Sequence, residues 1–247
     1  MAGTLRRFFT NIVCGFIPGD KARRKVRVML NNPHARKYIK FVQDWANTNC
    51  GGAKKISINF GVGCQNLIVI LNNEHVFKFC LGPNTADYQR ELNICNALRK
   101  HTSFKIPEME IINWNGTIIR RYEFVSGKLL CDFTPTFIML HRKKLASQLA
   151  QFMFEIGRSD PITIRKFKNQ KNAKPGYLYG WFHNDIGQNF LMDDDLNIIG
   201  FIDWDAVDFC DFKPSMYMAE RFWNKNGYRG LMTDVLYEYS KLYYANK

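Results

Sequence analysis

The chain has 247 residues, of which 46% are hydrophobic and 23% charged, a composition typical of a globular protein with a full core and not of a disordered chain. Its apolar runs are too short for a membrane-spanning helix. Its seven cysteines are scattered without any CxxC spacing, which argues against a disulfide framework and a zinc site and favours a cytosolic protein with reduced thiols.

The net charge is +13, and it is concentrated at the N-terminus: residues 1–45 contain ten Lys or Arg and two Asp, a net +8. Apolar residues lie between these charges, and a helical arrangement would gather them into one stripe. We therefore expect a basic amphipathic arm that contacts an anionic membrane surface at the cytoplasmic face. A pair of packed helices with solvated charges is an equal alternative. Nucleic acid is disfavoured, because no stacking platform or recognition-helix pattern accompanies the charge.

Residues 46–124 have the pattern of a small, mainly β lobe. Apolar runs bounded by turn residues predict strands at 57–60, 65–71 and 75–81, and again at 109–112 and 117–124. Gly61 and Gly63, between the first two strands, predict a glycine turn whose backbone amides can approach phosphate oxygens, because no Cβ stands in the way. A plain hairpin is the alternative for this turn.

Lys78 lies in the third predicted strand between Phe77 and Phe79, where an ammonium group is costly unless it is paired. The next segment, 87–100, predicts a helix with its apolar residues along one face and Glu91 on the inner side. We therefore expect an ion pair between Lys78 and Glu91. A surface lysine on an edge strand is the alternative.

Residues 125–247 have the pattern of a helical lobe. Apolar residues at helical spacing predict a core helix at 142–157 and two further helices between 216 and 247. The stretch from 160 to 180 is basic and polar, which predicts a loop or frayed helix. Its charges are either solvated or able to grip an acidic acceptor; they are Arg165, Lys166, Lys168, Lys171 and Lys174.

The most informative stretch is HNDIGQNFLMDDDLNIIGFIDWD, residues 183–205. It predicts two short strands around a turn at 193–195, so that Asp185 and Asn189 before the first strand face Asp203 after the second. Such oxygen-bearing side chains, without a Cys/His cluster, suit Mg²⁺. A simple Asx turn is the alternative for the Asp-x-x-x-Asn segment alone, but the whole combination is hard to obtain from turn chemistry.

These residues resemble the catalytic loop and metal-binding strand of the aminoglycoside phosphotransferase and choline kinase family, which is related in fold to the protein kinases. The shared features are a His-x-Asp loop with a following Asn, then an Ile-Asp-Trp-Glu/Asp segment, here 202–205. The family usually has four residues between the Asp and the Asn, whereas three separate Asp185 from Asn189. It also commonly has a His near the end of the helix at 142–157, where this chain has Ile156 and Gly157.

The resemblance implies an α+β, bilobal, protein-kinase-like fold, with a β-rich nucleotide-binding lobe at 46–124 and a helical catalytic lobe at 125–247. It implies that Asp185 orients or deprotonates the acceptor hydroxyl and that Asn189 and Asp203 hold Mg²⁺, with Asp205 as a substitute ligand. It further implies a set of residues that bind ATP through side chains or backbone atoms: Lys78, Glu91, Gly61, Gly63, Cys64, Gln65, Glu123 and Val125.

The expected function is therefore ATP- and Mg²⁺-dependent phosphoryl transfer to a hydroxyl of a small metabolite or saccharide. The N-terminal arm loosely resembles the basic leaders of some bacterial surface-polysaccharide enzymes, which suggests a surface glycolipid or its precursor and a role in lipopolysaccharide biosynthesis. One alternative is a protein kinase acting on Ser, Thr or Tyr, which Ile-Asp-Trp-Asp in place of Asp-Phe-Gly disfavours. The other is an inactive kinase-like adaptor at a membrane surface.

Overall fold

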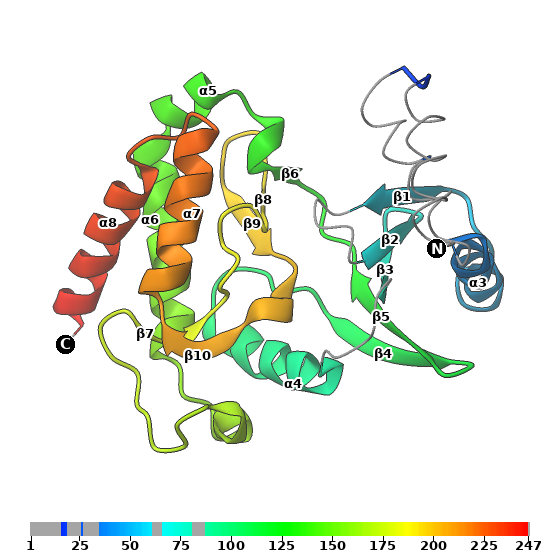
Figure 1. The fold of residues 1–247 in the computed structure, drawn as a ribbon, viewed down its shortest axis with the longest axis horizontal. Coiled ribbons are helices and arrows are strands. Elements are labelled where there is room, and N and C mark those ends of the chain that lie inside the picture. The colour runs from blue at the N-terminus through cyan, green and yellow to red at the C-terminus, as the bar shows by residue number, and fades with distance from the viewer. Residues whose placement is uncertain (1–15, 19–25, 27–34, 61–65, 81–86, 247) are drawn as a thin grey trace, which may run out of the picture. The chain divides into compact units, whose positions relative to one another are not determined.

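The computed structural model describes residues 16–18, 26, 35–60, 66–80 and 87–246 (Figure 1). Most of the expected basic arm lies outside these residues, and so does the whole glycine turn with Gly61, Gly63, Cys64 and Gln65. The chain divides into two compact units. The first contains the described residues up to 80 together with Met109–Phe124, and the second contains residues 87–108 and 125–246. Both combine antiparallel strands with helices, so the fold class is α+β.

The first unit is built on a five-stranded antiparallel sheet with the order β1-β2-β3-β5-β4. Two of its hairpins follow directly from local turn chemistry. Asn115 and Gly116, the two residues between β4 and β5, have positive φ angles, the conformation that two-residue hairpin turns require. Asn72 and Asn73 also have positive φ angles and begin the three-residue connection between β2 and β3, in which the amide of Glu74 donates to the carbonyl oxygen of Leu71. The strands are β1 (Ile56–Phe60), β2 (Asn66–Leu71), β3 (His75–Cys80), β4 (Met109–Trp114) and β5 (Thr117–Glu123).

Helix α3 (Ala35–Asn49) covers one face of this sheet and forms the core of the first unit with it. Phe41 and Val42 are buried against Leu67 and Phe79, and the ring of Tyr38 stacks on Phe79 with 4.5 Å between ring centroids. The expected boundary between residues 45 and 46 falls inside this helix. The last residues of the stretch assigned to the arm are therefore packed on the sheet.

The second unit has a core of helices, with α6 running alongside α8 (Figure 1). The predicted apolar stripe of α6 is buried, from Leu145 through Phe152 to Ile156. This confirms the core helix. The helices of this unit are α4 (Tyr88–Leu98), α5 (Pro135–Leu140), α6 (Arg142–Arg158), α7 (Lys213–Lys225) and α8 (Leu231–Ala245).

Two small antiparallel sheets complete the second unit. One has the order β6-β8-β9, with β6 (Lys128–Leu129), β8 (Phe190–Met192) and β9 (Ile198–Phe201). The other pairs β7 (Tyr179–Phe182) with β10 (Asp208–Asp211), so that Asp208 lies opposite Phe182. The hairpin of β8 and β9 confirms the predicted strands around the turn at 193–195. The strands β7 and β10 were not predicted.

Helix α4 belongs to the second unit although it lies in the sequence between strands of the first. Arg90 fixes it there by donating to the carbonyl oxygen of Val207 and to the Asp208 carboxylate, both at 2.8 Å. Arg99 donates to the carbonyl oxygens of Ile106 and Pro107. Among the described helices, none is long and apolar enough to cross a lipid bilayer.

Candidate active site

The β8–β9 hairpin brings the predicted loop and the predicted metal-binding strand together. Phe190 pairs with Phe201, and the next backbone bond runs from the amide of Ile202 to the carbonyl oxygen of Asn189 at 2.9 Å. Asn189 is therefore opposite Ile202, and Asp203 is the next residue on the neighbouring strand. The register of an antiparallel pair thus places Asn189 and Asp203 at the same end of the hairpin, as the sequence predicted.

His183 is buried and braces this end of the hairpin. Its Nε2 lies 2.8 Å from the carbonyl oxygen of Ile202, which can only accept, and its Nδ1 lies 3.4 Å from the amide nitrogen of Asp185, which can only donate. These partners assign the neutral tautomer with the proton on Nε2. The ring also packs edge-on against Trp204, with 4.8 Å between centroids. His183 therefore links the loop to the second strand.

Asp185 is exposed, while Asn189 is buried. The Nδ2 of Asn189 donates to the Asp185 carboxylate at 2.6 Å and to the Asp185 carbonyl oxygen at 3.1 Å. Both partners are acceptors, so the amide orientation is determined and Oδ1 of Asn189 points elsewhere. The loop with three intervening residues therefore still brings Asn189 back to Asp185. The indole of Trp223, on α7, supports the turn by donating to the carbonyl oxygen of Gly187 at 2.7 Å.

Asp203 follows β9 in a left-handed backbone conformation, with φ 61° and ψ 66°. This conformation costs a non-glycine residue about 1–3 kcal/mol and persists only where the surroundings impose it, and such residues cluster at functional positions. Here Trp204 imposes it: its side chain is buried, and its indole donates to the carbonyl oxygen of Phe201 at 2.9 Å. Asp203 is therefore exposed, while Phe201 and Trp204 on either side of it are buried and fix the backbone.

Asp205 is also exposed, and the short 3-10 helix that contains it, Trp204–Ala206, contacts α4. Burial raises the pKa of the Cys95 thiol on α4 well above its usual range, and the carboxylates of Glu91 and Asp205 raise this pKa further. Glu91 itself is buried. The second unit thus brings Asp185, Asn189 and Asp203 together around the hairpin end, and it places Asp205 towards the helix that carries Glu91.

The oxygen donors at this end suit a Mg²⁺ ion that is shared with phosphate oxygens. Asn189 has an amide oxygen to offer and Asp203 a carboxylate, which are the hard ligands that Mg²⁺ prefers. Within the described part of the chain, no group of three or more His, Cys, Asp or Glu side chains is placed to hold a metal ion. Kinases usually bind Mg²⁺ through one or two protein oxygens, and substrate phosphates complete its coordination.

The remaining predicted residues lie in the first unit or outside the described residues. Lys78 is buried in β3. In the register of the sheet it lies opposite Arg120 on the neighbouring strand β5, and Arg120 is also buried. Two cations opposite each other on one face of a sheet strengthen the need for negative charge nearby. Glu123 ends β5 and is half-buried. The ion pair of Lys78 with Glu91 stays a prediction.

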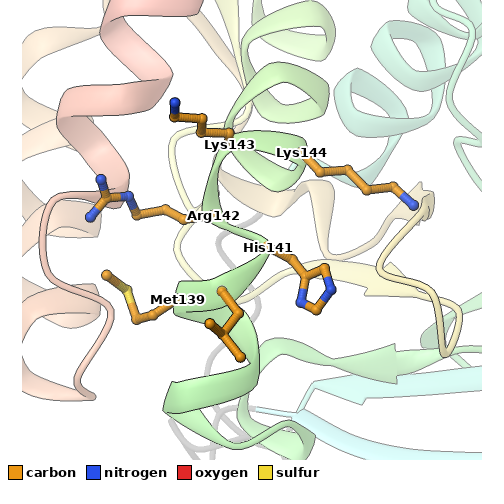
Figure 2. A pocket seen from close by; sticks show the side chains of 6 residues that line it. Met139, His141, Arg142, Lys143 and Lys144 are labelled. Carbon is orange, nitrogen blue, oxygen red and sulfur yellow. The ribbon is translucent and has the colours of Figure 1, made fainter.

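A separate hollow of about 420 Å³ lies where α5 meets α6 (Figure 2). Its lining residues, Met139–Lys144, include none of the predicted site residues. Two of its cations are engaged within the second unit: Arg142 pairs with the Asp234 carboxylate, and Lys144 donates to the carbonyl oxygen of Asp195. This hollow is therefore distinct from the end of the hairpin that carries Asn189 and Asp203; its contact with the hairpin is at the turn, through Asp195.

Three side chains that frame the site were not singled out from the sequence. They are Arg90 on α4, Asn184 in the loop, and Ser215 on α7, whose hydroxyl donates to Oδ1 of Asn184 at 2.6 Å. The signal for Asn184 was present in principle, because Asn is enriched where φ is positive, and its φ is 62°. Arg90 and Ser215 have no local sequence signal.

Comparison with solved structures identifies the fold. The chain aligns over 82% of its length with 86% of the GDP complex of an aminoglycoside 2'-phosphotransferase-IIIa, at TM-score 0.57 and 17% identity. It aligns over 81% with 81% of the streptomycin–ATP complex of APH(2")-IIa, at TM-score 0.61 and 12% identity. A third match is the macrolide 2'-phosphotransferase MphH from Brachybacterium faecium, with 83% of each chain covered, TM-score 0.55 and 12% identity.

The chain has an aminoglycoside-phosphotransferase-like kinase fold. This confirms the fold expected from the His-x-Asp loop and the Ile-Asp-Trp-Asp segment. No protein-family model matches the sequence, and no curated protein matches it.

Proposed function

We propose that this protein transfers the γ-phosphoryl group of ATP to a hydroxyl of a small molecule, with Mg²⁺ as the metal. The observation that carries the proposal is the arrangement at the hairpin end. Asn189 holds the Asp185 carboxylate at 2.6 Å, and the same residue is paired through its backbone with Ile202, directly before the left-handed Asp203. The solved structures with the same fold include nucleotide complexes of phosphotransferases.

In this proposal Asp185 is the residue that faces the acceptor. Its carboxylate is exposed and is fixed from behind by the amide of Asn189, so it can receive a hydrogen bond from an incoming hydroxyl without first reorganising. That contact aligns the hydroxyl oxygen for in-line attack. The carboxylate accepts the hydroxyl proton as the new bond to the γ-phosphorus forms, while the bond from that phosphorus to the β,γ-bridging oxygen breaks and ADP leaves.

Asn189 and Asp203 would hold Mg²⁺, with Asp205 as the substitute ligand, and the bound ion would supply charge neutralisation on the phosphate oxygens. Lys78 would contact the same phosphates and pair with Glu91. The backbone of the glycine turn at Gly61, Gly63, Cys64 and Gln65 would cover the phosphates, and backbone atoms of Glu123 and Val125 would contact the adenine.

For the acceptor we propose a saccharide or small metabolite that carries negative charge, such as a surface glycolipid or its precursor. The support is the basic segment that leads into β7 and the catalytic loop. Lys168 is buried there and anchors the segment, since it pairs with Asp160 at 2.6 Å and lies 4.0 Å from the ring centroid of Phe209. Arg165, Lys166, Lys171 and Lys174 remain exposed around it. Contact of residues 1–45 with an anionic membrane is part of the same proposal.

Two measurements test the proposal. In thermal unfolding, ATP with Mg²⁺ should stabilise the wild-type protein, by about 2.7 kcal/mol at a ligand concentration of 100 Kd. In a transfer assay with labelled ATP, a screen of sugars, phosphosugars, choline and aminoglycosides should yield one labelled product class, and protein acceptors should stay unlabelled.

Asp185→Ala should keep the stabilisation by ATP and lose roughly 10²- to 10⁴-fold in transfer rate, because it removes only the group at the hydroxyl. Asp203→Ala should lose both the Mg²⁺-dependent part of the stabilisation and the transfer. Full transfer activity in Asp185→Ala would show that the catalytic assignment is wrong. No stabilisation of the wild type by nucleotide would favour the adaptor instead.

A further inference from the structure

Asn184 precedes the proposed catalytic residue and has a left-handed backbone with φ 62°. Asparagine and glycine tolerate this conformation better than other residues do. Glycine would satisfy the backbone equally well, so the backbone alone does not explain the side chain. The amide of Asn184 must be accounted for by its own contacts.

The Asn184 amide joins three elements of the second unit. Its Nδ2 donates to the carbonyl oxygen of Ala206 at 2.9 Å. Its Oδ1 accepts from the hydroxyl of Ser215 on α7 at 2.6 Å and from the thiol of Cys210 on β10 at 3.4 Å. A carbonyl oxygen can only accept, so the nitrogen must face Ala206 and the orientation of the amide is determined. All the polar atoms of the side chain are used.

The contact with Ala206 completes a pattern that begins with His183. His183 donates to the carbonyl oxygen of Ile202, directly before Asp203, and Asn184 donates to the carbonyl oxygen of Ala206, directly after Asp205. Two consecutive side chains of the catalytic loop therefore tie down both ends of residues 202–206. We call these five residues the metal segment, because they contain both carboxylates proposed to face Mg²⁺.

The two ends of the metal segment are held in different ways. Its N-terminal end is also held by the backbone bond between Ile202 and Asn189. Its other end turns through a short 3-10 helix, Trp204–Ala206, before β10 begins. The bond from Asn184 is the tie that acts on the segment itself at this end; the next pairing, of Asp208 with Phe182, lies two residues beyond Ala206.

We propose that Asn184 is a positioning residue that holds the metal segment at a fixed distance from Asp185, and that Ser215 orients its amide for this purpose. The inference rests on the proposed function in one respect, the identity of the ion that Asp203 and Asp205 face. The mechanical link between the loop and the segment does not depend on that identity. Side chains that orient metal-binding residues in this way typically change metal affinity or activity about 10- to 100-fold when removed.

The decisive variant is Asn184→Gly, which keeps the left-handed backbone and removes only the amide. Amide hydrogen exchange of residues 203–208 should become faster by about 10-fold or more, whether or not a substrate is known. In the thermal-shift titration, the Mg²⁺ concentration needed for half of the ATP-dependent stabilisation should rise by about 10-fold or more. The stabilisation by ATP without metal should stay the same. A general loss of stability would not raise the Mg²⁺ requirement while leaving the effect of ATP alone unchanged.

The matched control is Cys210→Ala, which removes the weak thiol contact to the same Oδ1 and should leave both measurements unchanged. Ser215→Ala should shift both in the direction of Asn184→Gly by a smaller factor, and it serves as the test variant where Asn184→Gly does not fold. Unchanged exchange in residues 203–208 in the folded test variant would overturn the proposal. If the wild type shows no Mg²⁺ or nucleotide effect at all, the proposed function fails, and the exchange measurement still decides the link.

Discussion

Gly180, in the strand that leads into the proposed catalytic loop, is the position where the smallest substitution should have the largest effect. A β-carbon at Gly180 would lie 2.0 Å from the carbonyl oxygen of Gly157 and 2.9 Å from its carbonyl carbon. Both neighbouring atoms belong to the backbone of α6, so no side-chain rotation can relieve the overlap. Gly180→Ala therefore forces β7 and α6 apart.

The size of the effect follows from this distance. Ordinary van der Waals contact at such a site begins near 3.4 Å, so the two elements must separate by roughly 1.4 Å in a close-packed core. Gaps of 0.5–1 Å already remove about a quarter to a half of each dispersion contact. We expect a loss of about 3 kcal/mol in the free energy of unfolding, at the upper end of overpacking effects. The unfolding temperature should then fall by roughly 6–12 °C.

Thermal unfolding followed by far-UV circular dichroism measures this shift, and Gly176→Ala is its matched control. Gly176 lies four residues earlier, and the nearest atom to its β-carbon would be Cβ of Tyr179 at 3.9 Å. Its substitution should change stability by less than about 1 kcal/mol, with a gain favoured because alanine restricts the unfolded chain. An unfolding temperature for Gly180→Ala within 2 °C of that of Gly176→Ala would refute the packing argument.

Two further predictions concern contacts within the second unit. Arg90→Ala removes two hydrogen bonds, to the carbonyl oxygen of Val207 and to the Asp208 carboxylate, and should lower the free energy of unfolding in urea by about 2 kcal/mol. The control is Asn169→Ala, which removes an exposed contact to the same carboxylate and should cost under about 0.5 kcal/mol. Equal losses in the two variants would contradict the role of Arg90. Burial raises the pKa of Tyr239 from 10.0 to about 12, so the folded state keeps a proton that the unfolded state releases. The contribution of Tyr239 to stability should therefore be complete below pH 10 and be lost as the pH rises from 10 to 12. Tyr239→Phe should make the loss of stability between pH 10 and pH 12 smaller in thermal unfolding, and an identical alkaline slope in both proteins would contradict this prediction.

The close approach of α6 and β7 also accounts for a departure that the sequence showed and did not explain. The family that the sequence resembles commonly has a His near the end of this helix, where this chain has Ile156 and Gly157. A β-carbon at Gly157 would lie 2.9 Å from the ring of Phe212. Glycine is therefore the residue that lets Phe212 and β7 reach the helix. No local pattern around residue 157 reports this, because both contacting residues are more than 20 positions away.

The predicted elements that were confirmed are those whose signal is local. The strands β2 and β3 are short, mainly apolar runs on either side of an Asn-Asn turn, and the core helix α6 repeats its apolar residues every three or four positions. The β8–β9 hairpin follows from apolar runs around the turn at 193–195. In each case the hydrophobic period and the turn residues act within about ten positions, so they can be read along the chain.

The sequence by itself determined that a hairpin lies between Asn189 and Asp203, because apolar runs on either side of the turn at 193–195 pair so that both are buried. Only the tertiary structure decided how that hairpin is held. Arg90 reaches Val207 across 117 positions, Asn184 reaches Ala206 across 22 and Ser215 across 31. Partners this far apart are chosen by the packing of whole helices and strands, and such packing leaves no pattern in the residues on either side of each partner.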